Sequence, residues 1–170
     1  MSLLTNPQIT TVACTLADLL QDRQYALRGT SSLVLQGFEM KVDDVDIVCD
    51  EGTALATNTI LKSYVVEPVK FSETAQFRSF YGKFIIMGVP VEVMGNWQIK
   101  NDKGIWSEIF DGKSIIELDL SGHRVHLTPV GVELKMFLYM SRWNAYHKIK
   151  SQFEARNPKD SLNKPQPSLL

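Results

Sequence analysis

Residues 27–47 read LRGTSSLVLQGFEMKVDDVDI, and this stretch decides the fold that we expect for the chain. It begins inside a short predicted strand, residues 25–28, which Gly29 ends. Hydroxyl residues at 30–32 then precede the apolar residues 33–35, an order that is typical of a helix N-terminus. A glycine lets the backbone approach a ligand closely, and the free N–H groups of a helix start suit phosphate. We therefore predict a strand, a glycine turn and a helix that can hold a phosphate group.

The second half of the stretch places two carboxylates, Asp44 and Asp46, on a strand predicted over residues 42–49. Alternate side chains of a strand point to the same face, so both acids share one face while Val45 and Ile47 point into the core. Two carboxylates held this close repel each other unless a cation or a proton lies between them. Magnesium prefers oxygen ligands and is the expected cation. The alternative interpretation is the solvated face of an edge strand.

A third acid follows in the segment VPVEVMG, residues 89–95, where Glu92 alternates with Val91 and Val93. Taken alone, a charge in a predicted hairpin (77–87 with 90–94) is ordinary. If this strand lies beside the strand that carries the aspartates, three carboxylates converge. Such a triad can hold two metal ions for phosphoryl chemistry.

Together these motifs resemble the nucleotidyltransferase superfamily that includes DNA polymerase β and the aminoglycoside and lincosamide nucleotidyltransferases. Gly29-Thr30 matches the glycine motif, and thirteen residues, Ser31–Asp43, separate it from the acidic motif Asp44–Ile47. Val91–Val93 matches the strand with the third acid. The resemblance covers residues 27–94. Three departures are Arg28 in place of an apolar residue, Thr30 in place of Gly or Ser, and Glu92 in place of Asp.

The resemblance implies an α+β fold with a nucleotidyltransferase-like mixed β-sheet, flanking helices and a C-terminal helix. It implies that Asp44, Asp46 and Glu92 are both catalytic residues and ligands of two Mg²⁺ ions. Glu92 would also accept the proton of the attacking hydroxyl. The β- and γ-phosphates of a nucleoside triphosphate would be bound by three residues: Gly29, Thr30 and Ser31. A nucleoside monophosphate would pass to an acceptor, with release of pyrophosphate.

Residues 132–153 carry the longest helical pattern of the chain and are predicted to form one helix. Aromatic and apolar side chains that include Met136, Tyr139 and Trp143 share a stripe on it. This stripe is interpreted either as part of the core or as a surface that binds a partner, for example a second copy of the chain in a homodimer. Lys135 and Arg142 lie seven residues apart and would share a face of this helix, so both are candidate nucleotide-binding residues.

Turn residues and apolar periodicity divide the rest of the chain. Helices are expected from residue 6 to about 21 and over 53–63, and a strand is expected over 65–69. A second hairpin is expected at 114–118 and 123–127. Residues 95–111, which are mixed and hold several Gly, Asn and Asp, are predicted to be loop.

The composition describes an ordinary globular chain. The 170 residues are 44% hydrophobic and 22% charged, which predicts one domain over residues 1–155 and a flexible C-terminal tail over 156–170. A net charge of −1 argues against a dedicated tRNA binder but is compatible with a local basic patch. Cys14 and Cys49 lack the spacing of a zinc site and fit a reducing cytoplasm. No segment predicts a membrane span.

Several functions stay open at this point. The first is a magnesium-dependent nucleotidyltransferase whose acceptor is a small molecule, a protein or an RNA. Antibiotic adenylylation and a toxin of a toxin–antitoxin or phage-defence pair are subclasses of it. The alternative is a non-catalytic member of the same fold that binds a nucleotide or a partner protein. A purely structural interaction domain is a third class.

Overall fold

The structure is a computed structural model and describes residues 3–157. The helices are α1 (Asn6–Leu19), α2 (Gly29–Leu35), α3 (Glu51–Ile60), α4 (Val130–Tyr139) and α5 (Trp143–Arg156), with a short 3-10 helix at Lys62–Tyr64. The strands are β1 (Tyr25–Arg28), β2 (Val45–Cys49), β3 (Val65–Glu73), β4 (Phe77–Ile86), β5 (Val89–Ile99), β6 (Ile116–Leu120) and β7 (His123–Leu127). Of the predicted tail, residues 158–170 lie outside the described part of the chain.

The strands form one seven-stranded sheet in the order β3-β4-β5-β2-β1-β7-β6. β2 pairs with β5 in parallel, and β1 pairs with β7 in parallel, whereas the remaining neighbours are antiparallel. The sheet is therefore mixed and flanked by helices, which confirms the predicted α+β class. The predicted adjacency of the two acidic strands, β2 and β5, is also correct.

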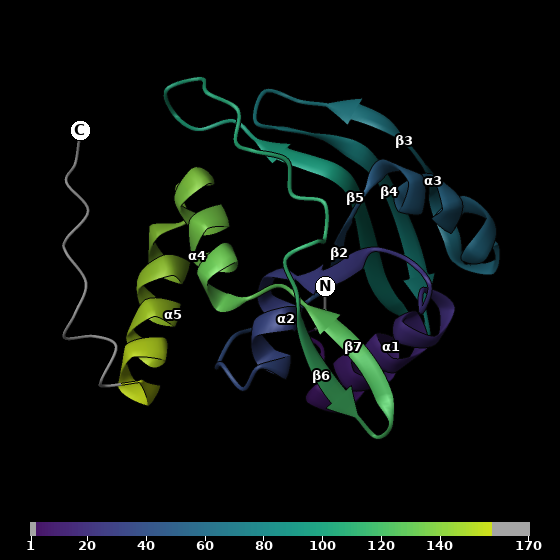
Figure 1. Ribbon diagram of the computed structural model, residues 1–170, viewed down its shortest axis with the longest axis horizontal. Helices are drawn as coiled ribbons and strands as arrows, with labels where there is room; N and C mark the ends of the chain where they lie inside the picture. The colour runs from purple at the N-terminus through teal and green to yellow at the C-terminus, as the bar shows by residue number, and fades with distance from the viewer. Residues whose placement is uncertain (1–2, 158–170) are drawn as a thin grey trace.

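Helices cover both faces of the sheet. α1 and α3 pack against one face, where Val12, Leu16 and Ala54 meet Val45 and Ile47 of β2 in the largest buried cluster. This is the apolar face that strand alternation predicted for β2. Figure 1 shows α4 and α5 on the other side of the sheet from α3.

The opposite face of the sheet holds a smaller cluster in which Met136 of α4 packs with Val48 and Met94. α2 joins this layer because its buried Leu33 clusters with Phe137 of α4 and with Ile149 of α5. The acids of β2 therefore emerge on the face that α2 and α4 border.

The predicted loop at 95–111 is wrong at its start, because β5 continues to Ile99. Gly95 reads as a loop residue, but it lies in the strand where α3 approaches closely. A Cβ on Gly95 would lie 2.5 Å from the Cβ of Ala54. Asn96, with a φ of 48°, marks an irregularity at which the register of β4 and β5 shifts. Such β-bulges change the direction of the side chains that follow them.

The single helix predicted over 132–153 is also wrong, because α4 ends at Tyr139 and α5 begins at Trp143. Ser141 adopts a φ of 54°. The N–H of Arg142 donates to the carbonyl of Phe137, and the N–H of Ser141 donates to that of Leu138. This is a Schellman C-terminal motif, in which a non-glycine residue takes the left-handed position. Of the helices within residues 3–157, none is long and apolar enough to cross a membrane.

Candidate active site

A row of charged residues crosses five adjacent strands. Arg28 lies opposite Asp46, Asp46 opposite Glu92, Glu92 opposite Lys83, and Lys83 opposite Glu67. Residues that are directly opposite each other point to the same face of a sheet. Two neighbouring carboxylates are thus flanked by a cation on each side, which limits their repulsion without neutralising it.

The three predicted acids meet at this row. Asp44 immediately precedes β2, Asp46 lies in β2 and Glu92 lies in β5. One carboxylate oxygen of each residue lies within 4.8 Å of the others. The neighbouring Asp43 is exposed. The structure therefore brings the predicted triad together.

Burial and mutual repulsion make these carboxylates hard to ionise in the absence of a cation. The pKa of Asp46 is raised to about 7: burial is the largest cause, the Arg28 charge opposes it, and the charges of Asp44, Glu92 and Glu133 add to it. Burial also raises the pKa of Asp44, helped by Asp43 and Glu92. A site that resists ionisation gains from a bound metal ion, because the cation stabilises the charged carboxylates.

The donor set suits magnesium. It consists of carboxylate oxygens alone, the ligands that this hard cation takes. Each acid can supply an oxygen to a common centre, since the three lie within 4.8 Å of one another. The residues present therefore fit the metal that the sequence motif implied.

Arg28, which departs from the family pattern, is part of the site. Its side chain is 6% exposed and its guanidinium lies 3.5 Å from Oδ2 of Asp46 and 3.9 Å from Oε2 of Glu133. The guanidinium carbon also lies 4.3 Å from the ring centroid of Trp97, a cation–π distance. Trp97 follows the bulge at Asn96 and clusters with the residues of this face.

Glu133 is the second residue that the sequence reasoning missed. It is fully buried in α4, and its Oε1 accepts a hydrogen bond from the Gly29 N–H at 2.7 Å. Burial raises its pKa, while Arg28 and the Gly29 N–H lower it. An acid inside the apolar run VGVELKMF, residues 130–137, was the available signal, because a buried charge is rare unless it is paired.

The structure places the predicted phosphate-binding residues around the glycine turn. Gly29 has a φ of 69°, and a Cβ there would lie 2.9 Å from Oδ2 of Asp46, so the turn touches the triad. Ser31 is buried, and its hydroxyl donates to the Arg28 carbonyl. Thr30 is half-buried at the start of α2. A phosphate at this turn would compete with Glu133 for the Gly29 N–H.

Lys135 and Arg142 do not share a helix face. Lys135 lies in α4, where its ammonium pairs with the carboxylate of Glu108 on the chain after β5. Arg142 lies in the turn between α4 and α5. Its positive charge partly opposes the burial that raises the pKa of Asp44 and of Glu133. Of the two, Arg142 is the one whose charge acts on an acid of the triad.

A cavity of about 420 Å³ opens beside the triad. Hydroxyl, aromatic and thioether side chains line it together with Arg28 and the three acids: Ser72, Thr74, Ser79, Phe77, Tyr81, Trp97, Met94 and Met140. Burial and a hydrogen bond to Glu92 raise the pKa of Tyr81, so this phenol stays protonated. The cavity can therefore enclose a ligand with a flat or apolar part next to the carboxylates.

Comparisons with known proteins agree with this geometry. A protein from Thermotoga maritima that is assigned as a nucleotidyltransferase has a similar structure, with 25% identity and a TM-score of 0.74 over 89% of this chain and 96% of that chain. The lincosamide antibiotic adenylyltransferase LnuA, solved with lincomycin bound, is similar at 14% identity and a TM-score of 0.53, over 88% and 99%. No protein-family model matches the chain, and no curated protein matches it.

These similarities define the class of the molecule. The chain has the fold of the nucleotidyltransferase superfamily, as the motifs of residues 27–94 predicted. Both neighbours are covered over nearly their whole length, so the similarity extends to the helices that follow the sheet.

Proposed function

We propose that the protein is a magnesium-dependent nucleotidyltransferase that transfers a nucleoside monophosphate from a nucleoside triphosphate to an acceptor. The observation that carries this proposal is the parallel register of β2 and β5, which sets Asp46 opposite Glu92 beside Asp44. Three carboxylates on one face, next to a cavity, are the arrangement that metal-assisted phosphoryl transfer requires. The names of the two structural neighbours support the same class of reaction.

In this proposal Asp44, Asp46 and Glu92 hold two Mg²⁺ ions, which would neutralise charge on the triphosphate and polarise its α-phosphate. Glu92 accepts the proton of the acceptor hydroxyl. A bond forms between the acceptor oxygen and the α-phosphorus, and the bond from the α-phosphorus to the bridging oxygen breaks. Pyrophosphate leaves with that oxygen. Arg28, fixed between Asp46, Glu133 and Trp97, keeps the acids in register.

The test is to incubate the protein with labelled ATP, GTP, CTP and UTP, magnesium and candidate acceptors, and to measure pyrophosphate release. Small molecules, proteins and RNA are the acceptor classes to include. The matched variant is Asp46→Asn, which keeps the shape of the side chain and removes its charge. Transfer that disappears in this variant supports the mechanism, whereas transfer that survives would show that the triad is not the catalytic centre.

A second candidate is a non-catalytic member of the fold that binds a nucleotide or a partner protein. It is favoured by the contacts that the chain makes with itself at the site. Arg28 pairs with Asp46, and the Gly29 N–H donates to Glu133, so groups that a substrate would use already have partners. Calorimetry separates the two candidates. A nucleotide that binds equally well with magnesium and with a chelator would favour the non-catalytic function.

A further inference from the structure

Tyr81 of β4 lies beside the residue that the proposed function uses as its base. It lines the same cavity as the triad, and its phenol donates a hydrogen bond to the carboxylate of Glu92. The sheet produces this contact. Lys83 lies directly opposite Glu92, and Tyr81, two residues earlier in β4, points to the same face. A hydroxyl group of the chain itself therefore lies where the hydroxyl of an acceptor would have to lie.

A general base must be within hydrogen-bond reach of the proton that it removes. Serine and threonine side chains also line the cavity, but the Thr74 hydroxyl is engaged with its own turn: it donates to the Phe77 carbonyl and accepts from the Phe77 N–H. Among the hydroxyl side chains that line this cavity in residues 3–157, Tyr81 is the one with a hydrogen bond to an acid of the triad. Its proton is thus the one that Glu92 can reach.

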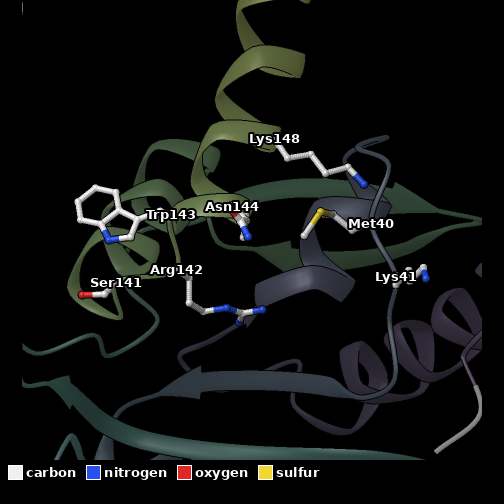
Figure 2. Close-up of a pocket in the computed structure, with 8 residues that line it drawn as sticks. Met40, Lys41, Ser141, Arg142, Trp143, Asn144 and Lys148 are labelled. Carbon is white, nitrogen blue, oxygen red and sulfur yellow. The ribbon is translucent and has the colours of Figure 1, made fainter.

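The cations near the site face a different space. A second cavity, of about 580 Å³, is lined by Lys41, Arg142 and Lys148. Figure 2 shows Arg142 and Lys148 extending toward the segment that carries Lys41, whereas Trp143 points to the opposite side. In the part of the chain that the structure describes, Arg28 is the cation that lines the cavity beside the triad, and it already pairs with Asp46. The space next to Glu92 therefore suits an uncharged hydroxyl such as a phenol.

We propose that Tyr81 is itself an acceptor, so that the protein transfers a nucleoside monophosphate to its own phenol oxygen. The inference rests on the proposed function and names a substrate of the same site. A bond forms between Oη of Tyr81 and the α-phosphorus of the nucleoside triphosphate, while the bond from that phosphorus to the bridging oxygen breaks. Pyrophosphate leaves with this oxygen, and the phenol proton passes to Glu92. The product is a phosphodiester between the nucleoside and the tyrosine.

The modification would limit itself. The cavity has a volume of about 420 Å³, which is enough for one ligand of small-molecule size. A nucleotide attached to Tyr81 would lie in this cavity and keep other acceptors away from Glu92. In the absence of any other acceptor, pyrophosphate release should therefore stop after one equivalent per chain.

The experiment incubates the full chain with magnesium and each of ATP, GTP, CTP and UTP, without an added acceptor. Intact-mass measurement is expected to show the gain of a single nucleoside monophosphate, and peptide mass spectrometry is expected to place it on Tyr81. Pyrophosphate release is measured in the same samples. A wild type that binds magnesium nucleotide and stays unmodified would overturn the inference.

Three variants test the assignment of the modified residue. Tyr81→Phe removes the hydroxyl and should lose the modification, and Asp46→Asn should lose it as well. Tyr64→Phe is the matched control, because Tyr64 packs against the apolar cluster on the other face of the sheet; it should be modified like the wild type. Modification of Tyr81→Phe at the wild-type level would place the acceptor elsewhere and overturn the inference. Melting temperatures of the variants confirm that each is folded.

Calorimetry and transfer to an external acceptor separate this inference from the proposed function. External transfer without modification of Tyr81 would overturn the inference and leave the proposed function standing. If Tyr81→Phe then lowered external transfer, Tyr81 would be a positioning residue for Glu92 and not an acceptor. Absence of both nucleotide binding and transfer would contradict the proposed function, and the inference with it.

Discussion

The Glu133 carboxylate of α4 accepts a hydrogen bond from the backbone N–H of Gly29 at 2.7 Å. A side chain from a distant helix thereby holds the glycine turn that precedes the acidic strand. Its second oxygen faces the Arg28 guanidinium at 3.9 Å, and Arg28 in turn faces Asp46. The position of the triad is therefore tied to the position of α4 through two buried charges.

This connection predicts a large cost for removing Glu133. Glu133→Ala should lower the free energy of unfolding by about 3 kcal/mol, because Arg28 would be left buried without one partner and the Gly29 N–H without its acceptor. Glu133→Gln keeps an acceptor for Gly29 and should cost less. Urea denaturation measures both. Glu117→Ala, at an exposed acid paired with His126, is the control, and the same loss in that variant would contradict the role of Glu133.

Gly29 is predicted to be required for metal binding as well as for the turn. In Gly29→Ala the new Cβ would lie 2.9 Å from Oδ2 of Asp46 at a φ of 69°, so the carboxylate must move. We expect a loss of about 1–2 kcal/mol of stability from the left-handed backbone, and weaker magnesium binding by calorimetry. Gly122→Ala has the same backbone strain, at a φ of 89°, with no atom within 4 Å of the added Cβ. If both variants bind magnesium like the wild type, Gly29 does not position Asp46.

Magnesium binding is predicted to depend on pH near neutrality. Because the pKa of Asp46 is raised to about 7, the metal-free site holds a proton below that pH, and magnesium must displace it. The apparent affinity should therefore rise with pH through about 7 and fall about tenfold per unit well below it. The proton on Asp46 also stabilises the folded metal-free state. This contribution of Asp46 to stability is fully present in acid and is lost as pH rises from about 4 to about 7.

Calorimetry at about pH 6, 7 and 8, in buffers with different ionisation enthalpies, measures the affinity and the proton that is released. Asp46→Asn is the matched variant, since it lacks the titrating group and should release less than the wild type. A wild-type affinity that is constant over this range would show that Asp46 is already ionised in the metal-free protein.

Local sequence features were sufficient for the part of the site that lies on strands. Alternation placed Asp46 on the face opposite Val45 and Ile47, and the VEV segment placed Glu92 in the same way. The order of the elements along residues 25–49 was predicted correctly, although the strand expected over 42–49 begins only at Val45. These features depend on neighbours in sequence, which is why a pattern reveals them.

The features that were missed depend on contacts between distant residues. Arg28 was noted only as a departure, because its partners Glu133 and Trp97 lie far away in the sequence. The break at Ser141 was invisible because a serine, not a glycine, takes the left-handed position. The strand at Gly95 was taken for loop because its reason, the close approach of Ala54 of α3, exists only in the folded chain.

Binding of a nucleotide through magnesium at the carboxylate triad is measured by calorimetric titration of ATP, GTP, CTP and UTP with magnesium into the wild type and into Asp46→Asn. At least one nucleotide is expected to bind the wild type in a magnesium-dependent way, and Asp46→Asn is expected to lose this binding while remaining folded. Absence of binding by all four nucleotides at millimolar concentration, or binding that Asp46→Asn leaves unchanged, would contradict this role of the triad.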